Sequence, residues 1–248
     1  MQVKVIGCST AWTSRPMSSY CLDDEILIDC GEGTTKYYAK NNLLLNNIKN
    51  IFITHFHSDH CFGLVQYFCQ HCIYNDKSKG KMLTIYGPKG LKRHLELLKV
   101  FAFGELDAKN IDIEECINIV ELDEEKPFVV GDYKVKFYTL NHGNLTNLAY
   151  VFEKDGKSIG FSGDCTYSEK VEEFAKSSNL CFLECCSDKT SQNHLGYDRF
   201  VEIKNRYRSN RYIAIHSVDA LYNNPDKYNI EFAIDGKKYV LGEKNDNE

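Results

Sequence analysis

Residues 54–60 read Thr54-His55-Phe56-His57-Ser58-Asp59-His60, and this stretch decides how the rest of the chain is interpreted. It follows an apolar segment, residues 48–54, whose pattern predicts a short strand. Side chains at alternate positions of an extended segment project to the same side, so His55 and His57 can reach one ion. Asp59 and His60 follow where the chain is expected to turn into a helix, and they offer a second pair of donors. Neutral imidazole suits zinc, and carboxylate oxygens suit zinc, manganese or iron.

Three further side chains of metal-binding type follow predicted strands in the second half of the chain. His142 follows a strand at 135–140, Asp164 follows a strand at 158–161, and His216 terminates a strand at 212–215. Open α/β sheets place their sites beyond the carboxyl ends of strands. A lone histidine is usually structural or exposed, but three metal-type residues at three strand ends favour one shared metal site.

Strands and helices alternate in both halves, which predicts an α/β layered fold in one domain spanning residues 1–248. In the first half we expect strands at 2–7, 20–22, 26–29 and 82–86, and helices at 34–40, 64–72 and 91–99. In the second half we expect strands at 133–140, 148–152, 158–161 and 212–215, then a terminal hairpin over 234–241 around Asp235-Gly236. A polar loop is expected at 75–81, and residues 101–125 form a partly irregular, phenylalanine-bearing segment.

The composition is that of an ordinary globular protein, with 43% hydrophobic and 26% charged residues. A formal net charge of −5 provides no broad basic face, which argues against stable nucleic-acid binding. No apolar run approaches the roughly 18 residues of a membrane span, so we expect no membrane partner. Eleven cysteines without a signal peptide are expected to be reduced thiols of a cytoplasmic protein, packed mostly in the core. Cys69 and Cys72 form one C-x-x-C pair, which alone is weak evidence of a metal site.

The order of the donors resembles that of the metallo-β-lactamase superfamily: H-x-H-x-D-H, then a single His, a bridging Asp and a last His. The resemblance covers nearly the whole chain and implies a four-layer αβ/βα sandwich with two metal ions at one edge between the sheets. It implies that His55, His57 and His142 hold the first ion. By the same resemblance Asp59, His60 and His216 hold the second, and Asp164 bridges both. We expect two divalent ions, Zn²⁺ or alternatively Mn²⁺, and two such ions suit hydrolysis of an ester or phosphodiester.

Two further segments resemble the tRNase Z-like phosphodiesterases within this superfamily. The block Asp29-Cys30-Gly31-Glu32-Gly33-Thr34 is typical of them, although its glycines alone indicate only a tight strand-to-helix turn. Glu184 and His194 lie in the order of a Glu and a His found between the bridging Asp and the last metal His. The resemblance gives His194 a catalytic role at the phosphate, as proton donor or charge partner. Asp59 and Glu184 are the other catalytic candidates.

The chain also departs from tRNase Z. That enzyme carries a long, tRNA-gripping arm between the single His and the bridging Asp, whereas here Asp164 follows His142 by 22 positions. A predicted hairpin fills this interval, and Leu183-Glu184-Cys185-Cys186 replaces the family's "HEAT"-like segment. Compact anti-Pycsar-type cyclic-nucleotide phosphodiesterases, which are homodimers, are similar in this respect. The resemblance therefore favours hydrolysis of a 3′,5′-cyclic mononucleotide (cyclic AMP, GMP, CMP or UMP) by a homodimer.

Three alternatives stay open at the level of sequence. The first is a tRNA 3′-endonuclease that works without the arm, and the second is a thioesterase or lactonase of the same superfamily. The third is a binding protein on a disabled scaffold, which the complete donor set argues against. His71 and His94 lie on predicted helices and receive no role. Certain aromatic residues could stack on a base or form a dimer face, with core packing as the alternative for each: Tyr67, Phe68, Tyr74, Phe101 and Phe103.

Overall fold

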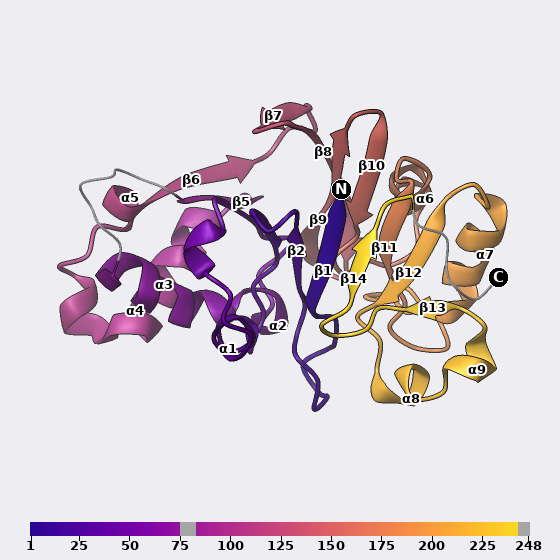
Figure 1. Cartoon of the computed structure of the whole chain (residues 1–248), viewed down its shortest axis with the longest axis horizontal. Coiled ribbons are helices and arrows are strands. Elements are labelled where there is room, and N and C mark those ends of the chain that lie inside the picture. The colour runs from indigo at the N-terminus through magenta and orange to yellow at the C-terminus, as the bar shows by residue number, and fades with distance from the viewer. Residues whose placement is uncertain (75–82, 243–248) are drawn as a thin grey trace.

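The computed structural model describes residues 1–74 and 83–242, with side chains described up to residue 71 and from residue 83 onward. Two seven-stranded sheets lie face to face at its centre (Figure 1). The first contains β1 (Gln2–Gly7), β2 (Ser19–Leu22), β3 (Ile26–Ile28), β4 (Asn50–Phe52), β5 (Leu83–Pro88), β6 (Ile117–Leu122) and β14 (Lys238–Val240). The second contains β7 (Phe128–Val130), β8 (Tyr133–His142), β9 (Leu145–Lys154), β10 (Lys157–Phe161), β11 (Leu180–Glu184), β12 (Arg211–Ile215) and β13 (Glu231–Phe232).

The two sheets share one pairing pattern. The strand orders are β14-β1-β2-β3-β4-β5-β6 and β13-β12-β11-β10-β9-β8-β7. In the first sheet pairing is antiparallel from β14 to β3 and parallel from β3 to β6. In the second it is parallel from β13 to β10 and antiparallel from β10 to β7. Because β8, β10 and β12 run in the same direction, their carboxyl ends lie at one edge of the sheet.

Helices cover the outer face of each sheet (Figure 1). On the first sheet these are α1 (Thr34–Lys40), α2 (Ser58–Cys61), α3 (Gly63–Tyr74), α4 (Leu91–Ala108) and α5 (Ile113–Cys116), with the 3-10 turn η1 (Leu45–Asn47). On the second they are α6 (Glu169–Lys176), α7 (Tyr197–Arg206), α8 (Asp219–Tyr222) and α9 (Pro225–Tyr228). None of the helices in the described part of the chain has the length and apolar character needed to cross a membrane.

The alternation of side chains along the strands produces the layers. On β4, Phe52 points into the core between the sheets, while its neighbours Ile51 and Ile53 pack against the helices. On β11, Phe182 faces the same central core and Leu183 faces the opposite helical layer. Because both faces of these strands are buried, the strands are almost wholly apolar. The four-layer αβ/βα sandwich implied by the resemblance is therefore confirmed.

Most elements expected from the sequence are present. The helix at 34–40 and the strand at 2–7 have the expected bounds, and β2 and β3 form the expected hairpin. The helix expected at 91–99 continues to Ala108 through a kink at Gly104, whose φ of 76° interrupts the helix. Residues 101–125 are therefore irregular only in part, since they also contain α5 and β6, with short connections at 109–112 and 123–125. The loop expected at 75–81 lies outside the described residues.

The hairpin expected over 234–241 is wrong. Its two arms belong to different sheets, because β13 pairs with β12 and β14 pairs with β1. The turn at Asp235-Gly236 is real, with Gly236 at φ 84°, but it carries the chain across from one sheet to the other. Both sheets present an open edge strand here, and these distant partners replace the local pairing that the turn signal predicts.

Candidate metal centre

The structure brings all seven predicted donors together at one edge of the two sheets. Four of them form one group whose donor atoms lie within 4.8 Å of one another: His55, His57, His142 and Asp164. The other three form a second group that meets the same limit: Asp59, His60 and His216. The Asp164 carboxylate lies between the groups, with Oδ2 3.9 Å from His55 Nε2 and Oδ1 3.2 Å from His60 Nε2. Asp164 therefore lies within reach of both groups, at the place that the resemblance gives to a shared aspartate.

Strand ends and one short helix position these donors. His142 is the last residue of β8, Asp164 follows β10 closely, and His216 comes directly after β12. Asp59 and His60 lie in α2. His57 stands directly before this helix and has an extended backbone (φ −66°, ψ 152°). His216 has a left-handed backbone (φ 55°), and its N–H donates to the Cys8 carbonyl at 2.8 Å. The donors thus lie at strand ends, on one short helix and on the segment that joins β4 to that helix.

The buried polar atoms of the cluster fit a bound cation. His55 Nε2, His60 Nε2 and Asp164 Oδ1 are buried and have no hydrogen-bond partner among the described residues. Buried polar atoms are normally paired, because leaving one unpaired costs about 1–3 kcal/mol. Metal ions held by the two donor groups would together satisfy all three. Imidazole nitrogens and carboxylate oxygens are the donors that Zn²⁺ and Mn²⁺ accept.

The electrostatics of the cluster also favour positive charge at its centre. Burial lowers the pKa of His60, but the Asp164 and Asp29 carboxylates raise it to about 10. Burial raises the pKa of Asp164, but the His216 and His60 imidazoles outweigh it and hold this pKa well below its ordinary value. The site therefore stabilises anionic carboxylates around a cationic centre, and a divalent cation bound there would supply that charge.

A second set of residues orients the imidazoles. Asp29 accepts a hydrogen bond from His60 Nδ1 at 2.7 Å, and the Thr54 backbone N–H also donates to Asp29, at 2.8 Å. His142 Nδ1 donates to the Asn193 carbonyl at 2.6 Å. When Nδ1 is used in this way, Nε2 is left without a proton and can bind metal. Sequence reasoning found Asp29 only through the resemblance, and it missed Asn193 because a backbone acceptor leaves no residue-type signal.

Gly31 of the same block is required by close packing. A Cβ atom at this position would lie 2.3 Å from the Asp59 carbonyl oxygen and 2.7 Å from Met17 Cβ. Only glycine lets these segments approach so closely. The block at residues 29–34 therefore does more than turn the chain, because Asp29 orients one donor and Gly31 admits the backbone of another.

His194 lies beside the donors and is joined to them through Glu184. His194 Nδ1 lies 2.6 Å from Glu184 Oε1 and 3.8 Å from Asp164 Oδ2, and its side chain is 30% exposed. Glu184 is fully buried behind His194 and His216, and it accepts hydrogen bonds from the Cys165 and Leu195 backbone N–H groups. Glu184, named above as a catalytic candidate, therefore occupies the place of a positioning residue, whereas His194 faces outward.

Other residues named from the sequence have structural surroundings. Tyr67 and Phe68 are buried in the core between sheet and helices, and so are unavailable to a ligand, and Phe103 packs at its margin. Phe101 is 71% exposed on α4, and the side chain of Tyr74 lies outside the described residues. His94, to which no role was given, stacks on Phe56, and the two ring centroids lie 3.8 Å apart. Phe56 stands between the donors His55 and His57 in the sequence. The ten described cysteines are all free thiols, and eight of them are buried.

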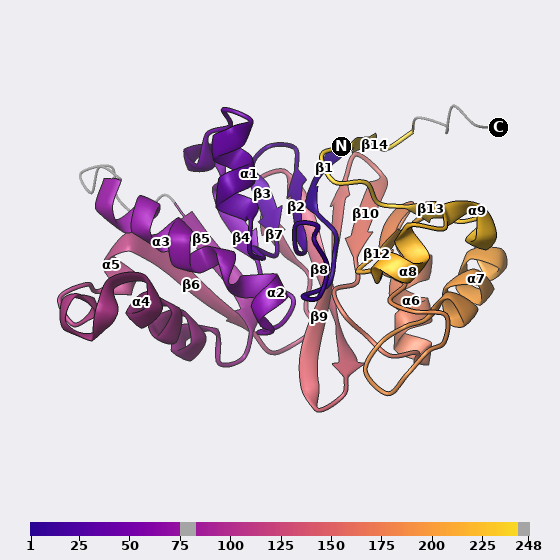
Figure 2. The ribbon, with the colours of Figure 1, turned by 90° about the horizontal axis from the view of Figure 1, so that it is seen from below.

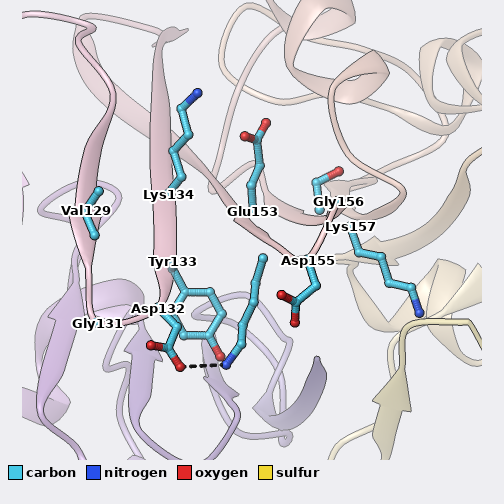
Figure 3. A pocket seen from close by; sticks show the side chains of 11 residues that line it. Val129, Gly131, Asp132, Tyr133, Lys134, Glu153, Asp155, Gly156 and Lys157 are labelled. Carbon is cyan, nitrogen blue, oxygen red and sulfur yellow. Dashed lines mark hydrogen bonds and ion pairs between the residues drawn. The ribbon is translucent and has the colours of Figure 1, made fainter.

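One cavity of about 550 Å³ lies away from the donors (Figure 3). It is lined by the turns at the other end of β8 and β9, near Asp132 and Asp155, whereas His142 ends β8. Its charges are of both signs and in part paired, as between Lys154 Nζ and Asp132 Oδ2 at 3.0 Å. Its position separates it from the metal-type cluster by most of the length of a strand.

Comparisons with known proteins agree with this geometry. The family described as Anti-Pycsar protein Apyc1 matches residues 1–239. Ribonuclease Z of Thermoplasma volcanium is 36% identical over 163 residues, which cover 62% of this chain and 49% of that protein. The chain thus spans about half the length, or less, of the curated relatives it matches.

Two solved structures show the same fold at low sequence identity. The metallo-β-lactamase fold protein YhfI from Bacillus subtilis has a TM-score of 0.76 and 18% identity, over 96% of this chain and 98% of that one. The short form of human tRNase Z has a TM-score of 0.73 and 23% identity, over 97% and 99%. The relatives and the two groups of metal-type side chains together support a metal-dependent hydrolase. The chain belongs to the anti-Pycsar protein Apyc1 family, in the tRNase Z-like branch of the metallo-β-lactamase superfamily.

Proposed function

We propose that this protein is a dinuclear metal-dependent phosphodiesterase that opens a 3′,5′-cyclic mononucleotide to the linear nucleotide. The observation that carries the proposal is His194, whose partly exposed imidazole stands 3.8 Å from the shared Asp164 carboxylate. A group at this place can give a proton to a ribose oxygen as it leaves phosphorus. Hydrolysis of a thioester or lactone has no comparable need for a further imidazole in addition to those that would hold the metals.

The proposed metal ligands are the seven clustered donors. His55, His57 and His142 would hold one ion and Asp59, His60 and His216 the other, with Asp164 shared. Two Zn²⁺ or Mn²⁺ ions held here would polarise a phosphodiester and lower the pKa of water. The chain itself contributes orientation, because Asp29 and the Asn193 carbonyl fix the rings of His60 and His142.

The protonation of His194 is set largely by Glu184. Burial lowers the pKa of His194, but the hydrogen bond and the charge of Glu184, with Asp164 behind it, raise this pKa above its ordinary value. Bound cations would neutralise the charge of Asp164. The increase that Glu184 causes in the pKa of His194 would remain. His194 is therefore suited to hold a proton near neutral pH and to donate it during turnover.

The choice of a small substrate is supported by the segment between His142 and Asp164. It consists of the hairpin β9–β10, every residue of it is described, and it contains no long arm. The family match covers residues 1–239 and supports the same choice. The ribonuclease Z relatives favour a second candidate, a tRNA 3′-endonuclease that works without the arm.

We also propose a homodimer, formed through an apolar patch on α4 and the end of α2. Leu97, Phe101 and Leu106 are 50%, 71% and 78% exposed, and Phe62 lies 6.2 Å from Phe101 between ring centroids. Apolar side chains gathered in this way on a surface are typical of subunit contacts. Sedimentation analysis of the purified protein, with Phe101→Glu as the disrupting variant, tests this part.

The test of the activity is a direct comparison of substrates. Protein loaded with Zn²⁺ or Mn²⁺ is incubated separately with cyclic AMP, GMP, CMP and UMP and with a precursor tRNA, and the products are separated by chromatography. We expect linear mononucleotides and intact precursor tRNA. Cleavage of the precursor with untouched cyclic nucleotides would instead establish the endonuclease.

A further inference from the structure

The chain contains one tryptophan, Trp12, and its indole is 95% exposed. Large aromatic side chains are usually buried to a considerable extent, and almost none of this ring packs against the described part of the chain. Trp12 lies on the connection between β1 and β2, here called the 8–17 loop after its residues. The position of the 8–17 loop relative to the metal-type donors therefore decides what this indole can contact.

Both ends of the 8–17 loop are attached to the segment that follows β12. The His216 N–H donates to the Cys8 carbonyl at 2.8 Å, and Arg15 Nη2 donates to the Ser217 carbonyl at 2.7 Å. The Arg15 guanidinium also lies 3.7 Å from the ring centroid of Tyr222 and pairs with Asp219, both on α8. The loop is therefore bound to a proposed metal ligand and to the helix beside it.

Met17, the last residue of the loop, lies close to α2 across Gly31. Met17 and the Asp59 carbonyl lie on either side of Gly31, close enough that a Cβ there would touch both. The Gly31 N–H donates to the Ser18 carbonyl at 3.0 Å. In both Figure 1 and Figure 2 the connection between β1 and β2 lies between α2 and α8. The loop thus rises from the edge of the sheets where both donor groups lie.

The loop is also closed by its own hydrogen bonds. The Ser9 N–H donates to the Pro16 carbonyl at 3.2 Å, and the Ser9 and Thr13 hydroxyls are hydrogen-bonded to each other. A loop braced in this way presents its tip at a fixed place, so little entropy is lost when a ligand packs on it. Phe62, another exposed aromatic residue at this edge, already lies against Phe101.

We infer that Trp12 is the surface on which the nucleobase of the substrate stacks, an inference that rests on the proposed phosphodiesterase function. In a 3′,5′-cyclic mononucleotide the ribose joins the base rigidly to the phosphate. When the phosphate is at the metals, the base must lie beside the same edge of the sheets. Every nucleobase has a π-face, so stacking on indole tolerates both purines and pyrimidines and favours the larger purines.

The test combines kinetics with fluorescence. Trp12→Ala and Trp12→Phe are compared with Leu44→Ala, which removes an exposed apolar side chain (67% exposed) on the connection between α1 and β4. Substrates are cyclic GMP, cyclic CMP and ribose 3′,5′-cyclic phosphate without a base. Trp12→Ala is expected to raise KM for cyclic GMP roughly 5- to 100-fold with little change in kcat, the range that base–aromatic stacking provides. KM for the base-free diester is expected to stay constant, Trp12→Phe to be intermediate, and Leu44→Ala to match wild type.

Because Trp12 is the only tryptophan, indole emission reports on it alone. Cyclic GMP added to the slow His194→Ala variant is expected to quench this emission, and the base-free diester is not. Turnover of cyclic GMP with unchanged KM in Trp12→Ala and no quenching would overturn the stacking role and leave the phosphodiesterase intact. A lower sedimentation mass of Trp12→Ala, with KM raised equally for the base-free diester, would make Trp12 a subunit contact and also overturn it. If no cyclic nucleotide is hydrolysed or bound, both proposals fail.

Discussion

Nδ1 of His194 lies 2.6 Å from Oε1 of Glu184, a carboxylate with no exposed surface. The same oxygen is 3.3 Å from Nδ1 of His216. One buried carboxylate therefore orients the proposed proton donor and also lies beside a proposed metal ligand. Backbone N–H groups hold its other oxygen, so the whole assembly is fixed before any substrate arrives.

Replacing His194 should separate catalysis from metal binding. His194→Ala is expected to lower kcat roughly 10²- to 10⁴-fold, the usual range for loss of a general acid, because the other imidazoles of the cluster are proposed metal ligands. Metal content, measured by mass spectrometry, is expected to stay near that of wild type, since the seven clustered donors are unchanged. A variant with near-wild-type kcat on the true substrate would show that His194 has no part in proton transfer.

Replacing Asp164 should affect both properties at once. Asp164→Ala removes the carboxylate that lies 3.9 Å from His55 Nε2 of one donor group and 3.2 Å from His60 Nε2 of the other. We expect metal content to fall by at least half, activity to be lost, and the stabilisation of Tm by added Zn²⁺ or Mn²⁺ to shrink, because binding to the folded state is weakened. Full metal content in this variant, measured beside wild type after the same dialysis, would contradict the shared-ligand role.

Asp29 should act on the metals without touching them. Asp29→Asn weakens the hydrogen bond that orients His60, and outer partners of this kind typically contribute 10- to 100-fold in metal affinity. When a competing chelator is titrated against the metal-loaded protein, half of the metal is expected to be removed at a chelator concentration roughly 10- to 100-fold lower than for wild type. Glu32→Gln, an exposed change in the same block, serves as the matched control and is expected to behave as wild type.

Gly163 should be required by packing as well as by conformation. A Cβ at this position would lie 2.3 Å from Asn147 Oδ1 and 2.8 Å from Thr54 Cβ, and φ is 59°. Gly156 has a similar φ of 71° but open space around it. Gly156→Ala is expected to cost about 1–2 kcal/mol in the free energy of unfolding, from backbone strain alone. Gly163→Ala is expected to cost clearly more in a urea titration; equal losses would show that the contacts at Gly163 relax without cost.

Asp198 should make stability depend on pH in the acid range. Burial raises its pKa, but hydrogen bonds from the Thr190 hydroxyl and backbone N–H outweigh burial and lower it below its ordinary value. A depressed folded-state pKa contributes stability above the unfolded-state pKa of about 4, and this is lost as pH falls through the folded-state value. The Tm difference between metal-free wild type and Asp198→Asn should therefore be constant above about pH 5 and shrink below pH 4. A difference independent of pH would rule out this charge as the cause.

The sequence by itself predicted the cluster of metal-type side chains and the fold class. The spacing of His55, His57, Asp59 and His60 is local, and hydrophobic periodicity places His142, Asp164 and His216 at strand ends. The helix at 34–40 and the hairpin of β2 and β3 were equally predictable, because neighbouring residues decide them. The layered architecture followed from the alternation of strands and helices.

Only the tertiary structure decided which distant segments meet. The turn at Asp235-Gly236 predicts a hairpin, yet the strands on its two sides pair with edge strands of different sheets. Pairing with an available sheet edge therefore outweighs the local turn signal. Likewise, no local pattern could assign the Asn193 carbonyl to His142 or the stacking of His94 on Phe56, since these contacts depend on chain packing. The cluster at residues 55–60 names the metal-type donors, and the surrounding fold determines how each is oriented.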